Sequence, residues 1–384
     1  YSGTNKYYTS AVAPDGRIFA VPHDAMNVLV IDPSRNISYH LSGSYSGSEK
    51  YYTSAVAPDG RIFAAPRSAL KVLVVDPSRN VSFQLSESYS GSNKYLTSAV
   101  ALDGRIFAAP WDESRVLVID PSRNISYQLS ESYSGNFRYF SSTVVPDGRI
   151  FASPFNALKV LVIDPSRNVS HQLSESYSGT EKYRANTVAP DGRIFAAPYS
   201  ASKVLVIDSS QNVSYQLNED YGVGYKYHTI TAATDGRIFA APSNAASKVL
   251  VIDPSLDVSY HLSDAYSGNW KYGTSSIALD GRIFAAPLGA SKVLVIDPSR
   301  NTSYLLSKDY SGYGYETSAV GPDGRIFAAP RFGSNVLVIY PGSYRYKTPA
   351  PTITFTPTQA PTASPTTSPT TFPTMSPKTA SPRT

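Results

Sequence analysis

Residues 51–66 read Tyr-Tyr-Thr-Ser-Ala-Val-Ala-Pro-Asp-Gly-Arg-Ile-Phe-Ala-Ala-Pro, and the chain of 384 residues carries eight copies of this pattern. Its Asp-Gly pair stands at 15–16, 59–60, 103–104, 147–148, 191–192, 235–236, 280–281 and 323–324, each time followed by Arg-Ile-Phe-Ala. Successive pairs are 44 residues apart except in the last two steps, which are 45 and 43. A constant period of about 20–50 residues is typical of repeat proteins, in which each copy is one supersecondary unit. The repeat therefore decides the fold.

The unit from 45 to 88 predicts four short strands. They are expected at 51–57, 61–65, 71–76 and 81–85. We interpret Asp59-Gly60 as a two-residue hairpin turn, because both residue types tolerate positive φ. The third strand is apolar on both faces, as expected of a strand buried between two layers.

Four antiparallel strands in about 40–45 residues match one blade of a β-propeller. A β-solenoid coil would be shorter, and a sandwich would not repeat so faithfully. We therefore expect an all-β, eight-bladed propeller over residues 1–347, with repeats that start near 1, 45, 89, 133, 177, 221, 266 and 310. Residues 343–347 can supply the outer strand of the last blade. The ring would then close by packing of blade one on blade eight, or through a further segment.

Two positions differ strongly among the copies. The first, on the innermost strand, holds Tyr8, Tyr52, Leu96, Phe140, Arg184, His228, Gly273 and Glu316. The second, just after the proline that ends the second strand, holds His23, Arg67, Trp111, Phe155, Tyr199, Ser243, Leu288 and Arg331. Across a two-residue turn, each member of the first set would directly oppose one member of the second.

These pairs have two interpretations that can both hold. They can ring one mouth of the central channel as a ligand surface, because Trp, Tyr and Arg dominate binding hot spots. Alternatively, complementary pairs such as Glu316–Arg331 stabilise their own hairpins by roughly 0.2–1 kcal/mol each. Under the first interpretation, Trp111→Ala and Arg67→Ala would abolish binding with little change in thermal stability. The candidate ligand-binding residues are Tyr8, His23, Tyr52, Arg67, Trp111, Phe140, Phe155, Arg184, Tyr199, His228, Glu316 and Arg331.

The Pro-Asp-Gly-Arg-Ile-Phe and Val-Leu-Val-Ile-Asp-Pro signatures resemble the NHL, SMP-30 and Kelch-like propeller repeats over about residues 1–347. Such propellers host enzymes, scaffolds and binding modules alike. The SMP-30 resemblance implies a carboxylate/Asn site for a divalent metal in the channel mouth, but among the variable inner-strand residues only Glu316 is of this type. The histidines, including His40, His171 and His261 on expected fourth strands, show no metal-ligand spacing. We therefore expect no catalytic residues, no metal and no cofactor.

Charge and composition narrow the range of partners. The net charge of +5 comes from Lys and Arg spread over all repeats, which does not indicate a nucleic-acid surface. The chain has no cysteine, and none of its apolar runs approaches the length of a membrane span.

Asn-x-Ser/Thr sequons recur at one position of the repeat, directly after the Pro-Ser-Arg turn. N-glycosylation around one rim would explain them, and so would a turn residue copied by duplication. The candidate N-glycosylation sites are Asn36, Asn80, Asn124, Asn168, Asn212 and Asn301, whereas the sixth repeat has Asp257 there.

Residues 348–384 form a second region, rich in Pro, Thr, Ser and Ala, with a Pro-Thr tetrad that recurs every four residues. Proline at this density favours extended polyproline II, and a period of four places prolines on all sides of that helix. This suits an O-glycosylated stalk better than a ligand for a single groove. Candidate O-glycosylation sites are Thr352, Thr358, Thr362, Thr366, Thr370 and Thr374.

Together these features favour a non-enzymatic, extracellular or cell-surface glycoprotein with a structural or adhesive role, as a subunit of an assembly or filament. Its partners would be further copies of itself or extracellular matrix and glycan components. A lectin-like propeller that binds glycans or peptides is the first alternative. An SMP-30-like lactone- or sugar-processing enzyme is the second.

Overall fold

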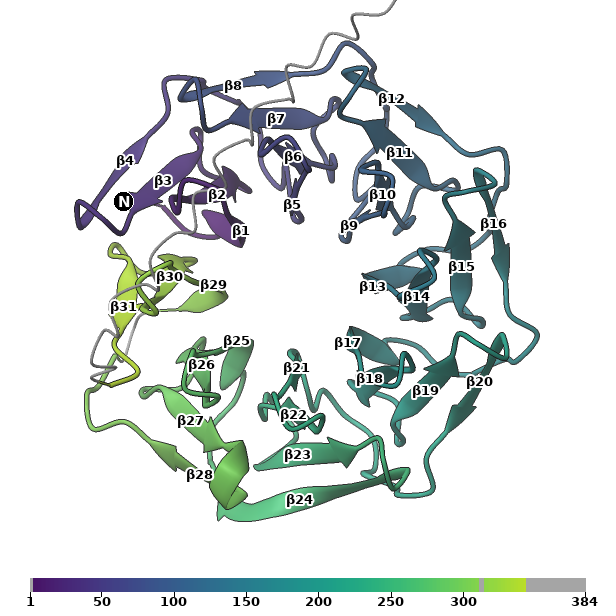
Figure 1. Cartoon of the computed structure of the whole chain (residues 1–384), viewed down its shortest axis with the longest axis vertical. Coiled ribbons are helices and arrows are strands. Elements are labelled where there is room, and N and C mark those ends of the chain that lie inside the picture. Colours follow the sequence, from purple (N-terminus) through teal and green to yellow (C-terminus); the bar gives the residue numbers. More distant parts are fainter. Residues whose placement is uncertain (1–2, 311–313, 343–384) are drawn as a thin grey trace, which may run out of the picture. The chain divides into compact units, whose positions relative to one another are not determined.

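The computed structural model describes residues 3–310 and 314–342 of this chain. They form an all-β propeller of eight antiparallel sheets arranged around a central channel (Figure 1). Each blade runs outward from its first strand to its last, so sequential strands are neighbours. The fold expected from the repeat is confirmed. The tail at 348–384, its candidate O-glycosylation sites and the outer strand expected at 343–347 lie outside the described residues.

The strands occupy equivalent places in successive blades. The innermost strands are β1 (Tyr7–Val12), β5 (Ala55–Val56), β9 (Ala99–Val100), β13 (Tyr139–Val144), β17 (Tyr183–Val188), β21 (Thr231–Ala232), β25 (Tyr272–Ile277) and β29 (Tyr315–Val320). The second strands are β2 (Ile18–Pro22), β6 (Ile62–Ala64), β10 (Ile106–Ala108), β14 (Ile150–Pro154), β18 (Ile194–Pro198), β22 (Ile238–Ala240), β26 (Ile283–Pro287) and β30 (Ile326–Pro330). The third strands are β3 (Leu29–Asp32), β7 (Leu73–Asp76), β11 (Leu117–Asp120), β15 (Leu161–Asp164), β19 (Leu205–Asp208), β23 (Lys248–Asp253), β27 (Leu294–Asp297) and β31 (Leu337–Ile339). The outer strands are β4 (Ile37–His40), β8 (Val81–Gln84), β12 (Ile125–Gln128), β16 (Val169–Gln172), β20 (Val213–Gln216), β24 (Val258–Ala265) and β28 (Thr302–Leu305). A short 3₁₀ turn, η1 (Pro298–Arg300), precedes β28.

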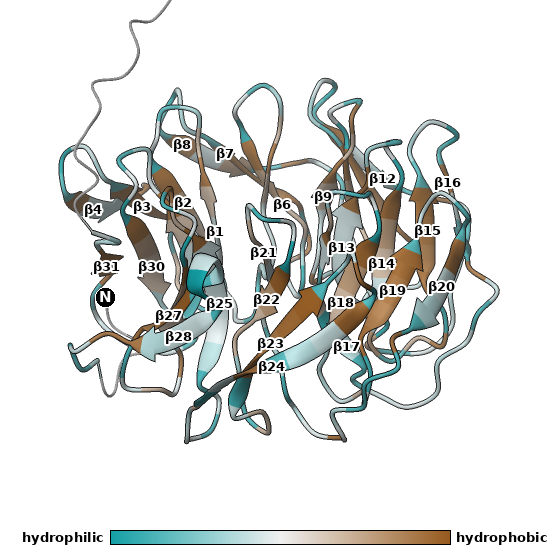
Figure 2. Ribbon diagram, turned by 60° about the horizontal axis from the view of Figure 1, so that its bottom comes forward, coloured by the Kyte–Doolittle hydropathy of each residue, from teal (hydrophilic) through white to brown (hydrophobic). Residues whose placement is uncertain are grey.

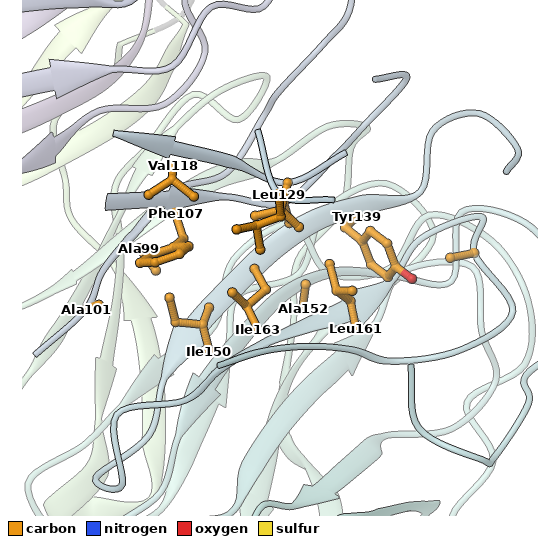
Figure 3. Close-up of a cluster of buried hydrophobic side chains, with 13 residues drawn as sticks. Ala99, Ala101, Phe107, Val118, Leu129, Tyr139, Ile150, Ala152, Leu161 and Ile163 are labelled. Atoms are coloured by element: carbon orange, nitrogen blue, oxygen red, sulfur yellow. The ribbon is translucent and has the colours of Figure 1, made fainter. Parts of the chain in front are cut away.

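The hydrophobic core lies between the blades. Phe107, Val118 and Leu129 of the third blade pack against Ile150 and Ile163 of the fourth (Figure 3). This explains why the third strands are apolar on both faces: each blade is covered by a neighbour on either side. Burying one such side chain stabilises the fold by about 1.5–3 kcal/mol. The outer strands face water on one side and are more hydrophilic, as β24 is beside β23 in Figure 2.

The ring closes by packing of the first blade on the last. Tyr7 and Ile18 share a buried cluster with Phe327. The Ser10 and Thr317 hydroxyls lie 2.9 Å apart, joining β1 to β29. Closure by blade-to-blade packing, one of the two alternatives left by the sequence, is therefore present within the described residues.

The hairpin turn differs from the expected two-residue turn. In the first blade the Ala13 N–H donates to the Arg17 carbonyl (2.8 Å) and the Gly16 N–H to the Ala13 carbonyl (2.9 Å), which closes a three-residue loop. Only Gly16 has positive φ (+82°), as in a type I turn followed by a left-handed residue. The residue before the Asp-Gly pair belongs to the loop, so the register Val12↔Ile18 is shifted by one residue from the predicted pairing.

An arginine latch joins each blade to the next at the face where these turns lie. Arg17 is held by Asp15 (2.6 Å) and reaches the second blade, where it donates to the Pro77 carbonyl (2.6 Å) and to Oδ1 of Asn80 (2.9 Å). Its guanidinium also lies over the Phe19 ring, 5.2 Å from the centroid. The equivalent latches are Arg61–Asn124, Arg105–Asn168, Arg149–Asn212, Arg193–Asp257, Arg237–Asn301 and Arg325–Asn36. From the seventh blade, Arg282 donates to the Pro341 carbonyl of the eighth. The most uniform residues of the repeat thus hold the ring together.

Candidate functional site

The variable residues meet at the mouth of the channel on the face opposite the latches. A cavity of about 810 Å³ lies there, within the range of about 300–1,000 Å³ typical of ligand pockets. Its lining includes Tyr8, Tyr52, Arg67, Leu96, Trp111, Phe140, Arg184, His228, Leu288 and Arg331 from the variable positions. Glu49, Asn93, Phe137, Asn269 and Trp270 from the linkers between blades complete it, together with Gly289 and Phe332 from the loops between second and third strands.

The predicted cross-strand register of the variable pairs is wrong, although their side chains are neighbours. The three-residue turn and a bulge between Tyr7 and Ser10 place His23 opposite Lys6, whose carbonyl accepts from the His23 N–H at 2.9 Å. The side chains nevertheless lean together, since the Tyr8 and His23 ring centroids are 4.2 Å apart. In the eighth blade, Arg331 Nη1 lies 3.0 Å from Glu316 Oε2.

A largely buried ion-pair cluster joins arginines of the cavity lining to Glu316. Arg184, from the fifth blade, donates to the Tyr52 hydroxyl of the second blade (3.0 Å) and to Glu316 Oε1 of the eighth (2.9 Å). Its guanidinium lies 4.3 Å from the centroid of the Phe140 ring. The Glu316 side chain is 5% exposed and also binds Arg331, so one carboxylate joins two arginines. Arg184 therefore crosses the channel, whereas the sequence paired it only with Tyr199.

His23 supports the charged half of the mouth from behind. Its Nε2 lies 2.8 Å from Nη1 of Arg67, and its Nδ1 lies 3.2 Å from the Asn5 carbonyl. Because arginine can only donate, Nε2 accepts and Nδ1 carries the proton. Burial and the Arg67 charge lower the pKa of His23 to about 4, so the imidazole is neutral near pH 7. Arg67 also donates to Asn93 Oδ1 at 3.0 Å, which fixes its position at the rim.

The other half of the mouth is aromatic. Trp111, Phe155 and Tyr199 are buried and form one cluster with Leu96. Trp111 is 7% exposed, so its removal would leave a hole in this cluster, at a cost of about 3–5 kcal/mol. The burial of Trp111 therefore predicts a loss of stability for Trp111→Ala, in contrast to the little change expected from the sequence.

Two exposed aromatic residues at the rim escaped the sequence reasoning. Phe137 and Trp270 are each 41% exposed and have φ of +55° and +51°. Positive φ is unusual for a bulky residue, and strained backbone of this kind clusters at functional sites. Other linkers have the same positive φ at this place and hold Asn5, Glu49, Asn93 or Glu181, so the left-handed backbone is a property of the repeat, and the aromatic residue is the change. The sequence does distinguish these two positions, because each has an aromatic residue where these other copies have Asn or Glu.

His228 adds a neutral polar group to the cavity lining. Burial, together with the charges of Arg184 and Arg331, lowers its pKa well below the usual value. Among the described residues neither of its ring nitrogens has a hydrogen-bond partner, and neither does the buried Ser243 hydroxyl.

The sequon asparagines take part in the latches on the other face. Asn80 has φ of +55° and accepts from Arg17 through Oδ1. The sequon serine is occupied as well, because Ser82 Oγ accepts from the Tyr45 hydroxyl at 2.8 Å. The sixth repeat, which has no sequon, makes the same contacts with Asp257 and Ser259. A role in the fold therefore explains both sequon residues, while glycosylation remains a prediction.

The variable residues do not provide a metal site. Glu316, the acidic residue among them, is occupied by two arginines. Within residues 3–310 and 314–342, no group of three or more His, Asp or Glu side chains is placed to hold a metal ion. The donor set implied by the SMP-30 resemblance does not fit this mouth. Nor does that part of the chain contain a helix long and apolar enough to cross a membrane.

Comparisons with known proteins support the fold and leave the function open. No family model and no curated protein matches the sequence. Among solved structures, a streptogramin B lyase superposes with a TM-score of 0.58 at 14% identity, covering 86% of this chain and 92% of that one. A virginiamycin B lyase from Staphylococcus aureus gives a TM-score of 0.58 at 14% identity, covering 74% and 92%. The extracellular domain of a putative hybrid two-component system from B. thetaiotaomicron gives 0.55 at 9% identity, covering 84% and 51%.

These likenesses show a β-propeller. Sequence identities this low do not indicate that the proteins share an activity or a ligand. The resemblance to the NHL, SMP-30 and Kelch-like group is confirmed as a propeller fold and not as membership of any of those families.

Proposed function

We propose that this chain is a non-enzymatic, extracellular adhesive protein whose propeller head binds a glycan in the cavity at the channel mouth. The observation that carries the proposal is the pair of exposed aromatic rings, Phe137 and Trp270, at the rim of that cavity. A flat aromatic ring open to water offers a stacking platform for the apolar face of a pyranose. Both rings stand at a linker position whose left-handed backbone recurs in other copies, where it holds Asn or Glu, and a bulky side chain is less favourable there than Asn.

The surroundings of the two rings suit a sugar better than a wholly apolar ligand. Arg67 stands at the charged side of the cavity beside Asn93, so donors and acceptors face the aromatic side. Aromatic lining combined with a few placed polar groups is the usual composition of a small-molecule site. The extracellular location rests on the sequons and the Pro/Thr tail, and the adhesive role rests on that location.

The carboxylate of Glu316 is saturated by its two arginines, and His23 is tied to Arg67. These groups are therefore engaged in structure, which supports binding without turnover. An enzyme would need a group free to exchange a proton with the substrate. His228 lines the cavity with ring nitrogens that lack partners among the described residues, but burial lowers its pKa and makes it a weak base.

The test is binding of full-length protein to a glycan array and, by calorimetry, to a panel of methyl glycosides. Trp270→Asn and Phe137→Asn place in these linkers the residue that Asn93 provides in another, so the backbone should be kept and each ring lost. We expect at least tenfold weaker binding with unchanged or slightly raised thermal stability. Phe83→Ala is the matched control, because Phe83 on β8 is also 41% exposed and lies outside the cavity lining.

Absence of binding by the wild-type protein, or equal binding by the Trp270→Asn and Phe137→Asn variants, would contradict the proposal. Hydrolysis or elimination of a bound glycoside would contradict its non-enzymatic part.

A further inference from the structure

The sixth blade carries buried polar atoms that the fold does not use. His228 is 6% exposed and lines the cavity. Ser243 is fully buried in the segment between β22 and β23, directly after Pro242, which bridges to Tyr227, the residue before His228. Among the described residues, both ring nitrogens of His228 and the hydroxyl of Ser243 lack hydrogen-bond partners. A buried polar group left unpaired destabilises the fold. The fourth blade has Phe140 and Phe155 at the same two positions, so apolar residues can fill them.

The hydrogen-bonding character of these atoms indicates what they would bind. The low pKa keeps His228 neutral, so one ring nitrogen donates and the other accepts. The Ser243 hydroxyl can also do both. An anion can only accept and an ammonium group can only donate, whereas a hydroxyl group matches both capacities. The nearby cations do not change this, because Glu316 already binds Arg184 and Arg331.

Trp270 places this polar niche beside a stacking platform. The His228 and Trp270 ring centroids are 5.3 Å apart, and the planes meet at 76°. Both residues line the same cavity, with Trp270 at the rim and His228 inside. The imidazole and the indole are therefore edge-to-face neighbours in one cavity, so a ligand that contacts Trp270 also lies close to His228.

We propose that His228 and Ser243 form a hydroxyl-recognising subsite, which selects a neutral sugar whose ring stacks on Trp270. The inference rests on the proposed glycan binding and adds a ligand class to it. It predicts that the sugar inserts a hydroxyl-bearing edge and that a charged substituent at that edge is rejected.

The experiment uses the full chain and methyl glycosides of glucose, galactose, mannose and fucose, together with the monodeoxy derivatives of the glycoside that binds most tightly. In the wild-type protein, removal of one particular hydroxyl should weaken binding roughly tenfold. His228→Phe should weaken binding of the parent glycoside by a similar factor. The His228→Phe variant should bind that one deoxy derivative and the parent glycoside with equal affinity. Ser243→Ala should show the same loss of discrimination to a smaller degree.

His171→Phe is the matched control, since His171 on β16 is exposed and lies outside the cavity. The imidazole NMR signals of His228 should also shift when the parent glycoside is added, and those of His171 should not. If the glycosides bind while His228→Phe and Ser243→Ala retain full discrimination, the subsite is refuted and glycan binding stands. If an acidic sugar binds better than its neutral parent, the assignment to a neutral hydroxyl is refuted. If no glycoside binds at all, glycan binding itself fails and the subsite fails with it.

Discussion

Replacing Glu316 by Gln tests the ion-pair cluster that crosses the channel. Gln keeps the shape of the side chain and one carbonyl oxygen but removes the charge that Arg184 and Arg331 share, at 2.9 and 3.0 Å. Two cations would then remain in a poorly hydrated site. Removing one partner of a buried pair costs about 3–5 kcal/mol. The Arg184 and Arg331 side chains are 16% and 22% exposed, so water screens them in part. We therefore expect Glu316→Gln to lower the free energy of unfolding by about 3 kcal/mol, the lower end of that range.

A double-mutant cycle isolates the contact across the channel. Arg184→Met alone should cost less than Glu316→Gln, because Glu316 keeps Arg331 as its partner. The double variant should be more stable than the sum of the two losses predicts, by about 1–3 kcal/mol. The free energy of unfolding would be measured by urea denaturation of the full chain, followed by tryptophan fluorescence and circular dichroism.

The control is Arg167→Met, because Arg167 is 81% exposed and lies 3.8 Å from Asp164. It should change the free energy of unfolding by less than about 0.5 kcal/mol. Additive losses for Glu316→Gln and Arg184→Met, within about 0.5 kcal/mol, would refute the bridge between the fifth and eighth blades.

Two further predictions concern the latch and the histidines. Asn124→Ala should lower the free energy of unfolding by about 1–2 kcal/mol, because the Arg61 bond is lost and alanine is disfavoured at the φ of +53°. Asn124→Asp should be tolerated, since Asp257 makes the same contact with Arg193; equal losses in urea denaturation would contradict this. His23 has a folded pKa of about 4 against the usual 6.5, so the unfolded chain binds more protons between these values. Stability should therefore fall as the pH drops from 6.5 to 4, by up to about 3 kcal/mol, and His23→Gln should remove that part of the slope in denaturation curves recorded at pH 7 and pH 4.

The fold was readable from the sequence because every element that builds it is repeated. The number of repeats predicted the number of blades. The apolar third strands indicated that one blade packs on another. The hairpin turn was misread because Asp-Gly alone does not distinguish a two-residue turn from the last two residues of a three-residue loop. The hydrogen bond between the Ala13 N–H and the Arg17 carbonyl decides this, and only the structure shows it.

The site was only partly readable, for a different reason. The positions that vary among the copies include most of the residues that line the cavity, and comparison of the copies identifies them without knowledge of contacts between distant blades. That comparison could not pair Arg184 with Tyr52 or Glu316, each 132 residues away, since those contacts arise only when the ring closes. Phe137 and Trp270 lie in linkers, outside the two variable positions of each hairpin, so variation at those positions does not indicate them.

The uniform arginine latches on one face allow the residues at the mouth on the other face to vary. The Arg–Asn contacts recur at the turns on one face and hold the blades at constant spacing, so the mouth residues need not all contribute to closing the ring. Once relieved of that task, those positions can hold groups that lower stability, such as the strained Trp270 and the unpaired His228. Drift alone would scatter such residues around the ring. Here the aromatic ones adjoin one another from Trp111 to Trp270, and the charged ones lie together on Arg184, Glu316 and Arg331. The two groups also contact each other, since the Arg184 guanidinium lies 4.3 Å from the Phe140 centroid and that of Arg331 lies 4.5 Å from the Tyr8 centroid. One asymmetric cluster within a nearly symmetric scaffold is what selection for one asymmetric ligand would produce.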